Sequence, residues 1–253
     1  MTPPSQAPAG AVVLKMIVSG AFKGAMQQLQ PAYETASGTT LAISWGPSMG
    51  DSPQSIPQRI AHQEPMDLAI MASETLDSLA STGAFELATR TDVATSRIGV
   101  GVPAGQPKPD ISSPQALCQS LLSAQTVAYS QGASGVYITS TLFTALGIAE
   151  QMHSKAVVVD GKELVGTALA RGDATLGMQQ VSELKVTPGV EYVGLLPEPL
   201  QKVSVFTAVV ATGSRHRAAA EAFIHYLTQG PALELLEKSG LEPGQVSGGD
   251  DQA

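Results

Sequence analysis

The sequence predicts an α/β protein built from two Rossmann-like lobes that are joined by two hinge strands. Short apolar segments alternate with helical ones at the spacing of βαβ units. Two continuous apolar segments, at 97–102 and 203–211, divide this series into parts. The length of 253 residues, 43% of them hydrophobic, allows two separate cores. The predicted domains are a discontinuous first lobe at 10–99 plus 207–243, a second lobe at 100–206, and flexible tails at 1–9 and 244–253.

Three apolar segments predict the strands that open the first lobe. The first, at 12–18, is followed by a helix over 21–35 that Pro31 is expected to kink or restart. The other two strands are expected at 41–45 and 67–71, with a short helix between them. Strands that alternate with helices in this way predict a parallel sheet.

The second lobe is expected to begin after the crossing strand at 97–102, with Ser113 and Pro114 as N-cap and first residue of a helix. The segment 203–211 is the predicted return strand. Further strands are expected at 127–130, 157–159, 175–178 and 192–195, and helices at 135–146, 215–228 and 233–238.

Composition excludes several classes of function. With 14 basic and 22 acidic residues the formal charge is −8, which argues against nucleic-acid binding. Cys118 is the single cysteine, so an intramolecular disulfide and cysteine-rich metal sites are excluded, and we interpret it as a small buried apolar residue. The four histidines are scattered, and phosphate-loop, dinucleotide and nucleophile-elbow motifs are missing. We expect no metal, no cofactor and a monomer.

The sequence also bears on membranes and compartment. No apolar run approaches the ~18 residues of a membrane span, so we expect no membrane insertion. The first residues lack a basic segment followed by a long apolar one, so no secretory signal is expected. Two interpretations stay open: a mature periplasmic chain with an added Met, or a full-length cytoplasmic protein.

Four loops that follow predicted strands share one chemical character. They are rich in Ser, Gly and side-chain amides, and each precedes a predicted helix, where free N–H groups and the positive end of the helix dipole favour anions. A single Ser-Gly pair usually just caps a helix. Four such loops at corresponding strand ends predict a site for a small anion. They lie at 19–22, 45–50, 130–135 and 179–182.

A few charged residues are further candidates. Arg97 opens the crossing strand near the expected cleft, and arginine suits bidentate binding of a carboxylate. The alternative is a salt bridge at the rim. Asp51, Glu74 and Asp92 are candidate bases, and each can equally be a cap or a solvated charge.

Several short segments together resemble the type 2 periplasmic binding proteins, in their molybdate-binding-like branch. The likeness covers nearly the whole chain and implies two lobes that close on a ligand like a Venus flytrap. The segments are VSGAF at 18–22, the Gly-rich loop after Trp45, EPMDL at 64–68, RIGV at 97–100, GASGVY at 132–137, GMQQ at 177–180 and KSGL at 238–241.

This resemblance implies ligand contacts at Ser19, Ser48, Ser134 and the Gln179 region. Molybdate binders usually carry a Tyr near the position of Gln179 and an Asn where Arg97 stands. An arginine and two glutamines favour a larger, carboxylated ligand instead. The full set of predicted ligand-binding residues is Ser19, Gly20, Phe22, Ser48, Met49, Arg97, Ser130, Ser134, Gly135, Tyr137, Gln179 and Gln180.

The segments SGAF, WGPSMG, SRIGV, YSQGASGVY and GMQQVSEL are similar to aconitate isomerase-like proteins, which move an allylic proton in a tricarboxylate. The resemblances thus imply two functions. We place first a solute-binding component of an ABC importer, with the importer's membrane component as partner. The alternative is an isomerase of cis- and trans-aconitate, with Ser19, Tyr137 and Glu74 as candidate catalytic residues.

Overall fold

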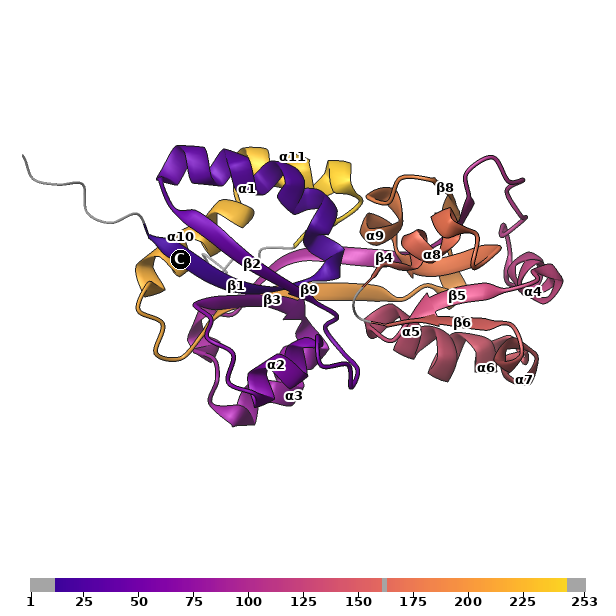
Figure 1. Ribbon diagram of the computed structural model, residues 1–253, viewed down its shortest axis with the longest axis horizontal. Coiled ribbons are helices and arrows are strands. Elements are labelled where there is room, and N and C mark those ends of the chain that lie inside the picture. The colour runs from indigo at the N-terminus through magenta and orange to yellow at the C-terminus, as the bar shows by residue number, and fades with distance from the viewer. Residues whose placement is uncertain (1–11, 161–162, 245–253) are drawn as a thin grey trace, which may run out of the picture.

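The computed structural model describes residues 12–160 and 163–244. The predicted tail at 1–9 and all of the predicted tail at 244–253 except Gly244 lie outside the described residues, and so do residues 10 and 11 of the predicted first lobe. The chain forms two α/β halves that lie side by side along the long axis of the molecule (Figure 1). Two long strands, β4 (Thr91–Pro103) and β9 (Val203–Val210), run between the halves.

In the described part of the chain, ten strands form one curled sheet with the order β2-β1-β3-β9-β4-β7-β5-β6, while β8 and β10 pair with β4. The other strands are β1 (Val13–Ser19), β2 (Thr40–Gly46), β3 (Leu68–Ala72), β5 (Val127–Ser130), β6 (Ala156–Val159), β7 (Leu176–Gln180), β8 (Val190–Leu195) and β10 (Glu242–Pro243).

Helices cover both faces of the sheet in each half (Figure 1). In the first half α1, α10 and α11 lie on one face and α2 and α3 on the other. The helices are α1 (Lys23–Ser37), α2 (Ile56–Ala61), α3 (Ser73–Leu79), α4 (Pro114–Ser123), α5 (Ala133–Tyr137), α6 (Phe143–Ala145), α7 (Ala149–His153), α8 (Val165–Arg171), α9 (Val181–Lys185), α10 (Arg217–Leu227) and α11 (Gly230–Ser239), with 3₁₀ turns η1 (Gly20–Phe22) and η5 (Glu198–Leu200).

The prediction of a parallel sheet is correct only within each half. Strand β1 pairs in parallel with β2 and β3, and β5 pairs in parallel with β6 and β7. The crossing strands are antiparallel to their neighbours, because β4 leaves the first half and β9 returns to it. A chain that crosses out once and back once must bring two opposed strands into the middle of the sheet.

Strand β4 changes partner along its length. Up to Arg97 it pairs with β9, and from Ile98 it pairs with β7 and β8. The first half is therefore the part that includes β1–β3, β9, β10 and β4 up to Arg97, and the second half includes β5–β8 and β4 from Ile98. The predicted lobe boundaries at 99/100 and 206/207 lie near these changes and stay a prediction.

Each half has its own apolar core. The clusters in the first half draw on residues 14–94 and 206–241, including the edge-to-face pair of Phe22 and Phe206 at 5.8 Å. The clusters in the second half draw on residues 98–200. Because the two sets share no residue, burial of apolar surface stabilises each half separately.

Two local predictions need correction. Pro31 does not restart its helix: α1 continues through it to Ser37, and Pro31 and the Gln27 carbonyl that it leaves without a donor lie on the exposed side, while the kink stays a prediction. Strand β4 begins at Thr91 rather than Arg97, because polar residues alternate with buried ones over that stretch. Ser113 and Pro114 are confirmed as N-cap and first residue of α4.

Candidate functional site

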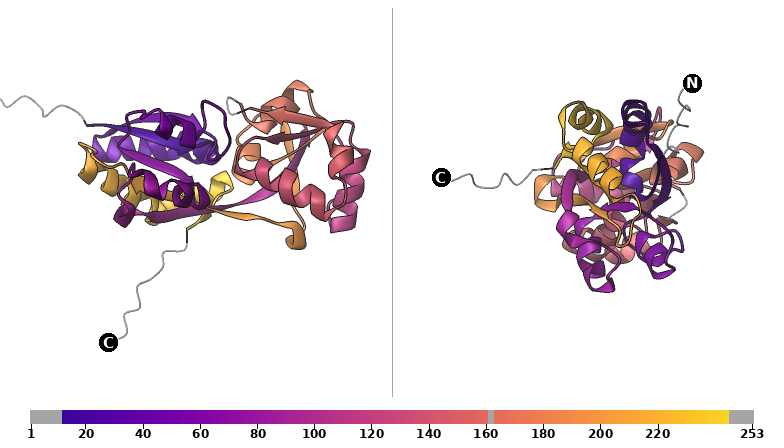
Figure 2. Two further views of the ribbon diagram at one scale, coloured as in Figure 1. Left: turned by 90° about the horizontal axis from the view of Figure 1, so that it is seen from below. Right: turned by 90° about the vertical axis from the view of Figure 1, so that its left-hand side faces the viewer.

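A cavity lies between the two halves, at the carboxyl ends of β1, β2, β5 and β7. It contains about 560 Å³ of space free of protein atoms, its open mouth included. In Figure 2 the crossing strands β4 and β9 run from one half to the other. The lining residues are Ser19, Gly20, Lys23, Trp45, Gly46, Pro47, Ser48, Ser130, Gln131, Gly132, Ala133, Ser134, Asp160, Glu163, Leu164, Gln179, Gln180, Glu183 and Phe206.

In the first half, the cavity wall is formed by the ends of β1 and β2, where Ser19 lies in register with Gly46. The Ser19 hydroxyl accepts a hydrogen bond from the Ala21 N–H at 3.4 Å and so caps the turn that leads into α1. The Ser48 hydroxyl accepts from the Ala72 N–H at 3.0 Å. Both hydroxyl oxygens are acceptors in these bonds, so each keeps its own proton for donation to an anion.

The second half contributes the start of α5. The Ser130 hydroxyl accepts from the Gly132 N–H at 3.2 Å, which fixes the loop from which α5 begins. Ser134 is 3% exposed and lines the cavity in the first turn of this helix. Its neighbour Gly135 does not line the cavity. An added Cβ there would stand 1.5 Å from the Ser130 carbonyl oxygen, so this glycine is required for packing.

Two glutamines end β7 and are almost fully buried. The Gln179 side-chain oxygen accepts from the Val165 N–H at 2.8 Å. The Gln180 amide donates to the Ser204 hydroxyl at 3.2 Å, and its oxygen has no partner among the described residues. If the Gln180 amide is rotated by 180°, its oxygen can accept a hydrogen bond from the Ser204 hydroxyl. The NH₂ group is then available to donate to an anion.

Sequence reasoning missed all four charged residues that line the cavity in the described part of the chain, and two of them, Lys23 and Glu183, lie at helix starts. Lys23 is the first residue of α1, and Glu183 lies in the first turn of α9. Burial raises the pKa of Glu183 to about 7, although Lys23, the Gln179 side chain and the Gln180 backbone act in the opposite direction. Each lies three or four residues after a strand end, so extension of the four loops by one helical turn would have found both.

The structure brings together most of the predicted ligand-binding residues but not all. Those that line the cavity are Ser19, Gly20, Ser48, Ser130, Ser134, Gln179 and Gln180. Phe22 packs in the core of the first half, and Met49, in the loop after β2, lies outside the lining. Side chains of these two residues therefore do not contribute to the cavity wall.

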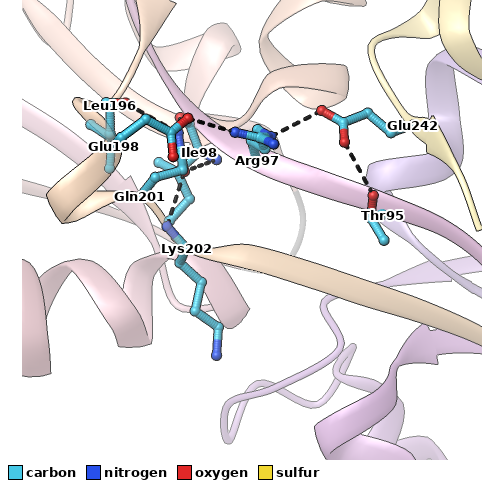
Figure 3. Close-up of polar contacts among 8 residues, drawn as sticks. All are labelled: Thr95, Arg97, Ile98, Leu196, Glu198, Gln201, Lys202 and Glu242. Carbon is cyan, nitrogen blue, oxygen red and sulfur yellow. Dashed lines mark hydrogen bonds and ion pairs between the residues drawn. The ribbon is translucent and has the colours of Figure 1, made fainter.

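Arg97 does not reach this cavity. Its guanidinium donates to Glu198 at 2.8 Å and to Glu242 at 3.0 Å (Figure 3). Glu198 belongs to the second half and Glu242 to the first, so Arg97 links the halves where β4 changes partner. Two carboxylates already neutralise the charge of Arg97. Its position fits the alternative prediction of a salt bridge at the rim.

The predicted catalytic residues Tyr137 and Glu74 also lie outside the lining. The Tyr137 hydroxyl donates to the Leu200 carbonyl at 3.0 Å, and Glu74 forms an ion pair with Lys202. Each side chain is engaged elsewhere, and only Ser19 of the three candidates lines the cavity.

The described part of the chain contains no cluster of metal-binding side chains. Within residues 12–160 and 163–244, no group of three or more His, Cys, Asp or Glu side chains is placed to hold a metal ion. Across the same residues, no helix combines the length and apolar character needed to cross a bilayer.

A family model of bacterial extracellular solute-binding proteins matches residues 14–242. The chain belongs to this family. It is 42% identical over 230 residues, 91% of this chain and 87% of the relative, to a Pseudomonas sp protein described as aconitate isomerase.

Solved structures show the same fold. The periplasmic molybdate-binding protein of Azotobacter vinelandii matches 92% of this chain and 100% of its own with a TM-score of 0.75 and 20% identity. The sulfate-binding protein SubI of Mycobacterium tuberculosis H37Rv matches 92% and 87% with a TM-score of 0.70 and 18% identity. The resemblance to type 2 periplasmic binding proteins is thereby confirmed.

Proposed function

We propose that this protein binds a small tricarboxylate in the cavity between its halves and isomerises it, with cis- and trans-aconitate as the substrate pair. The observation that carries the proposal is the position of the Glu183 carboxyl, whose pKa burial raises to about 7, among donors for anions. A site that only binds an oxyanion needs donors alone. A site that moves a proton also needs a group whose pKa lies near the working pH.

The likeness to aconitate isomerase supports this choice of substrate, since it extends over 91% of the chain. The donors suit a carboxylated anion: hydroxyls of Ser19, Ser48 and Ser134, the amides of both glutamines, and the Lys23 ammonium. Among the acidic groups of the lining, Glu163 is ion-paired with Arg171, which reduces its repulsion of an anion.

The reaction is an allylic proton shift. Removal of a proton from the CH₂ carbon of aconitate leaves a carbanion delocalised over three carbons, and protonation at the far carbon moves the double bond. Hydrogen bonds to the substrate carboxylates stabilise this charge, and enclosure between the halves excludes water that would compete for them.

The direct test is incubation of the full chain with trans-aconitate and chromatographic measurement of the cis isomer. Formation of the cis isomer above the enzyme-free rate supports the proposal. A lack of turnover at micromolar enzyme, in a protein that the anion stabilises in a thermal melt, would contradict it.

A second function is favoured by the family itself: capture of an anion for an ABC importer. It is supported by the match to extracellular solute-binding proteins over 14–242. Thermal melts with molybdate, tungstate, sulfate, citrate and aconitate separate the two, because a ligand that binds the folded state raises its stability. Stabilisation by an inorganic oxyanion without turnover of aconitate would favour transport, which also requires a periplasmic location.

A further inference from the structure

The carboxyl group of Glu183 bridges the two halves in the cavity: Glu183 belongs to the second half, and its carboxyl group contacts the backbone of the first. A Cβ added to Gly20 would stand 2.7 Å from one of its oxygens. The carboxyl group therefore packs on the Cα of Gly20, in the turn between Ser19 and α1. The absence of a side chain at Gly20 makes this approach possible.

The groups around Glu183 hold it in one position. Burial stabilises the neutral form of this carboxyl group and has the larger effect on its pKa. Lys23, the Gln179 side chain and the Gln180 backbone stabilise the carboxylate form and so lower the pKa. The remaining acidic residues of the lining are Asp160, which is exposed, and Glu163, which pairs with Arg171. Opposed influences of this kind let one carboxyl group exist in both protonation states.

We propose that Glu183 is the acid–base residue of the isomerisation, acting alone on both carbons. The inference rests on the proposed function. As a carboxylate it takes the proton from the CH₂ carbon, and the C–H electron pair enters the allylic system. As a carboxylic acid it then returns the proton to the far carbon. One C–H bond breaks and another forms, the double bond moves by one position, and no oxidant or reductant is needed.

Other groups fit this role less well. The Ser19 hydroxyl has an intrinsic pKa far above neutrality, and its oxygen accepts from the Ala21 N–H. Tyr137 donates to a backbone carbonyl, and Glu74 is paired with Lys202 outside the cavity. Lys23 is better suited to bind a substrate carboxylate, because its positive charge attracts the negative ligand.

The first test is Glu183→Gln, which keeps the size of the side chain and one acceptor oxygen but removes the transferable proton. We expect turnover of trans-aconitate to fall about 10²- to 10⁴-fold. Exchange of the CH₂ protons with D₂O, followed by ¹H NMR, should fall with it, while citrate still raises the melting temperature. Glu234→Gln, on the exposed side of α11, makes the same chemical change and should keep wild-type rates.

The second test moves the carboxyl group without changing it. In Gly20→Ala the added methyl displaces the Glu183 carboxyl, so the maximal rate should fall at least about tenfold while KM changes less. Wild-type turnover combined with a Glu183→Gln rate within about threefold of it would overturn the assignment and leave the isomerase function standing. Wild-type protein without turnover would instead remove the proposed function.

Discussion

Two basic residues lie near the junction of the halves, and they differ in what surrounds them. Lys23 lines the cavity beside the Ser19 turn, whereas Arg97 lies on the crossing strand between Glu198 and Glu242. Arginine is the better carboxylate ligand in principle. The charge of Arg97 is already neutralised by Glu198 and Glu242. Lys23 is therefore the better candidate to bind a carboxylate, because it lines the cavity.

The largest expected effect concerns the pH dependence of stability. The folded state keeps the Glu183 proton up to about pH 7, whereas the unfolded chain loses it in the usual range of a glutamate. Unfolding therefore releases a proton between these values, and the free energy of unfolding should decrease as pH rises to about 7. The size is on the order of 2–3 kcal/mol.

This decrease can be measured by urea denaturation of the ligand-free protein from pH 5 to pH 8. The relevant quantity is the difference between wild type and Glu183→Gln, because other groups titrate equally in both. Identical pH profiles for the two proteins would contradict the placement of Glu183, and the Glu234→Gln profile serves as the matched control.

The next effect is on affinity at the cavity. Lys23→Met removes a charged donor while it keeps the aliphatic stem, so citrate or aconitate should bind about 10- to 100-fold more weakly. Isothermal titration calorimetry on the full chain gives this ratio. Affinity within about twofold of wild type would show that the ammonium does not contact the ligand.

The smallest effect is expected at the other basic residue. Arg97→Met removes two partly exposed ion pairs, and such pairs contribute about 0–1 kcal/mol each, so affinity for the same anion should change less than about fivefold. The same calorimetric experiment applies. A loss greater than that of Lys23→Met would reverse the comparison and return Arg97 to the ligand.

The contrast explains which features the sequence could predict. Apolar strands and Ser-Gly loops depend on neighbours in the chain, so the positions of Ser19, Ser48, Ser134 and the two glutamines followed from local patterns. The partners of Arg97 are 101 and 145 residues away, and no local pattern identifies them.

Glu183 was missed for a related reason. An acidic residue in the first turn of a short helix is common, because it favours the positive end of the helix dipole. Its contact with Gly20 exists only when the two halves meet, so its unusual environment belongs to the tertiary structure rather than to α9.

A crystal structure of the full chain with tricarballylate, the saturated analogue of aconitate, tests the account most directly. We predict that its carboxylates contact Lys23, Ser48 and Ser134 in the cavity, with the Glu183 carboxyl within hydrogen-bond distance of the central carbons. An analogue bound against Arg97, or a cavity whose ligand leaves Glu183 untouched, would contradict it.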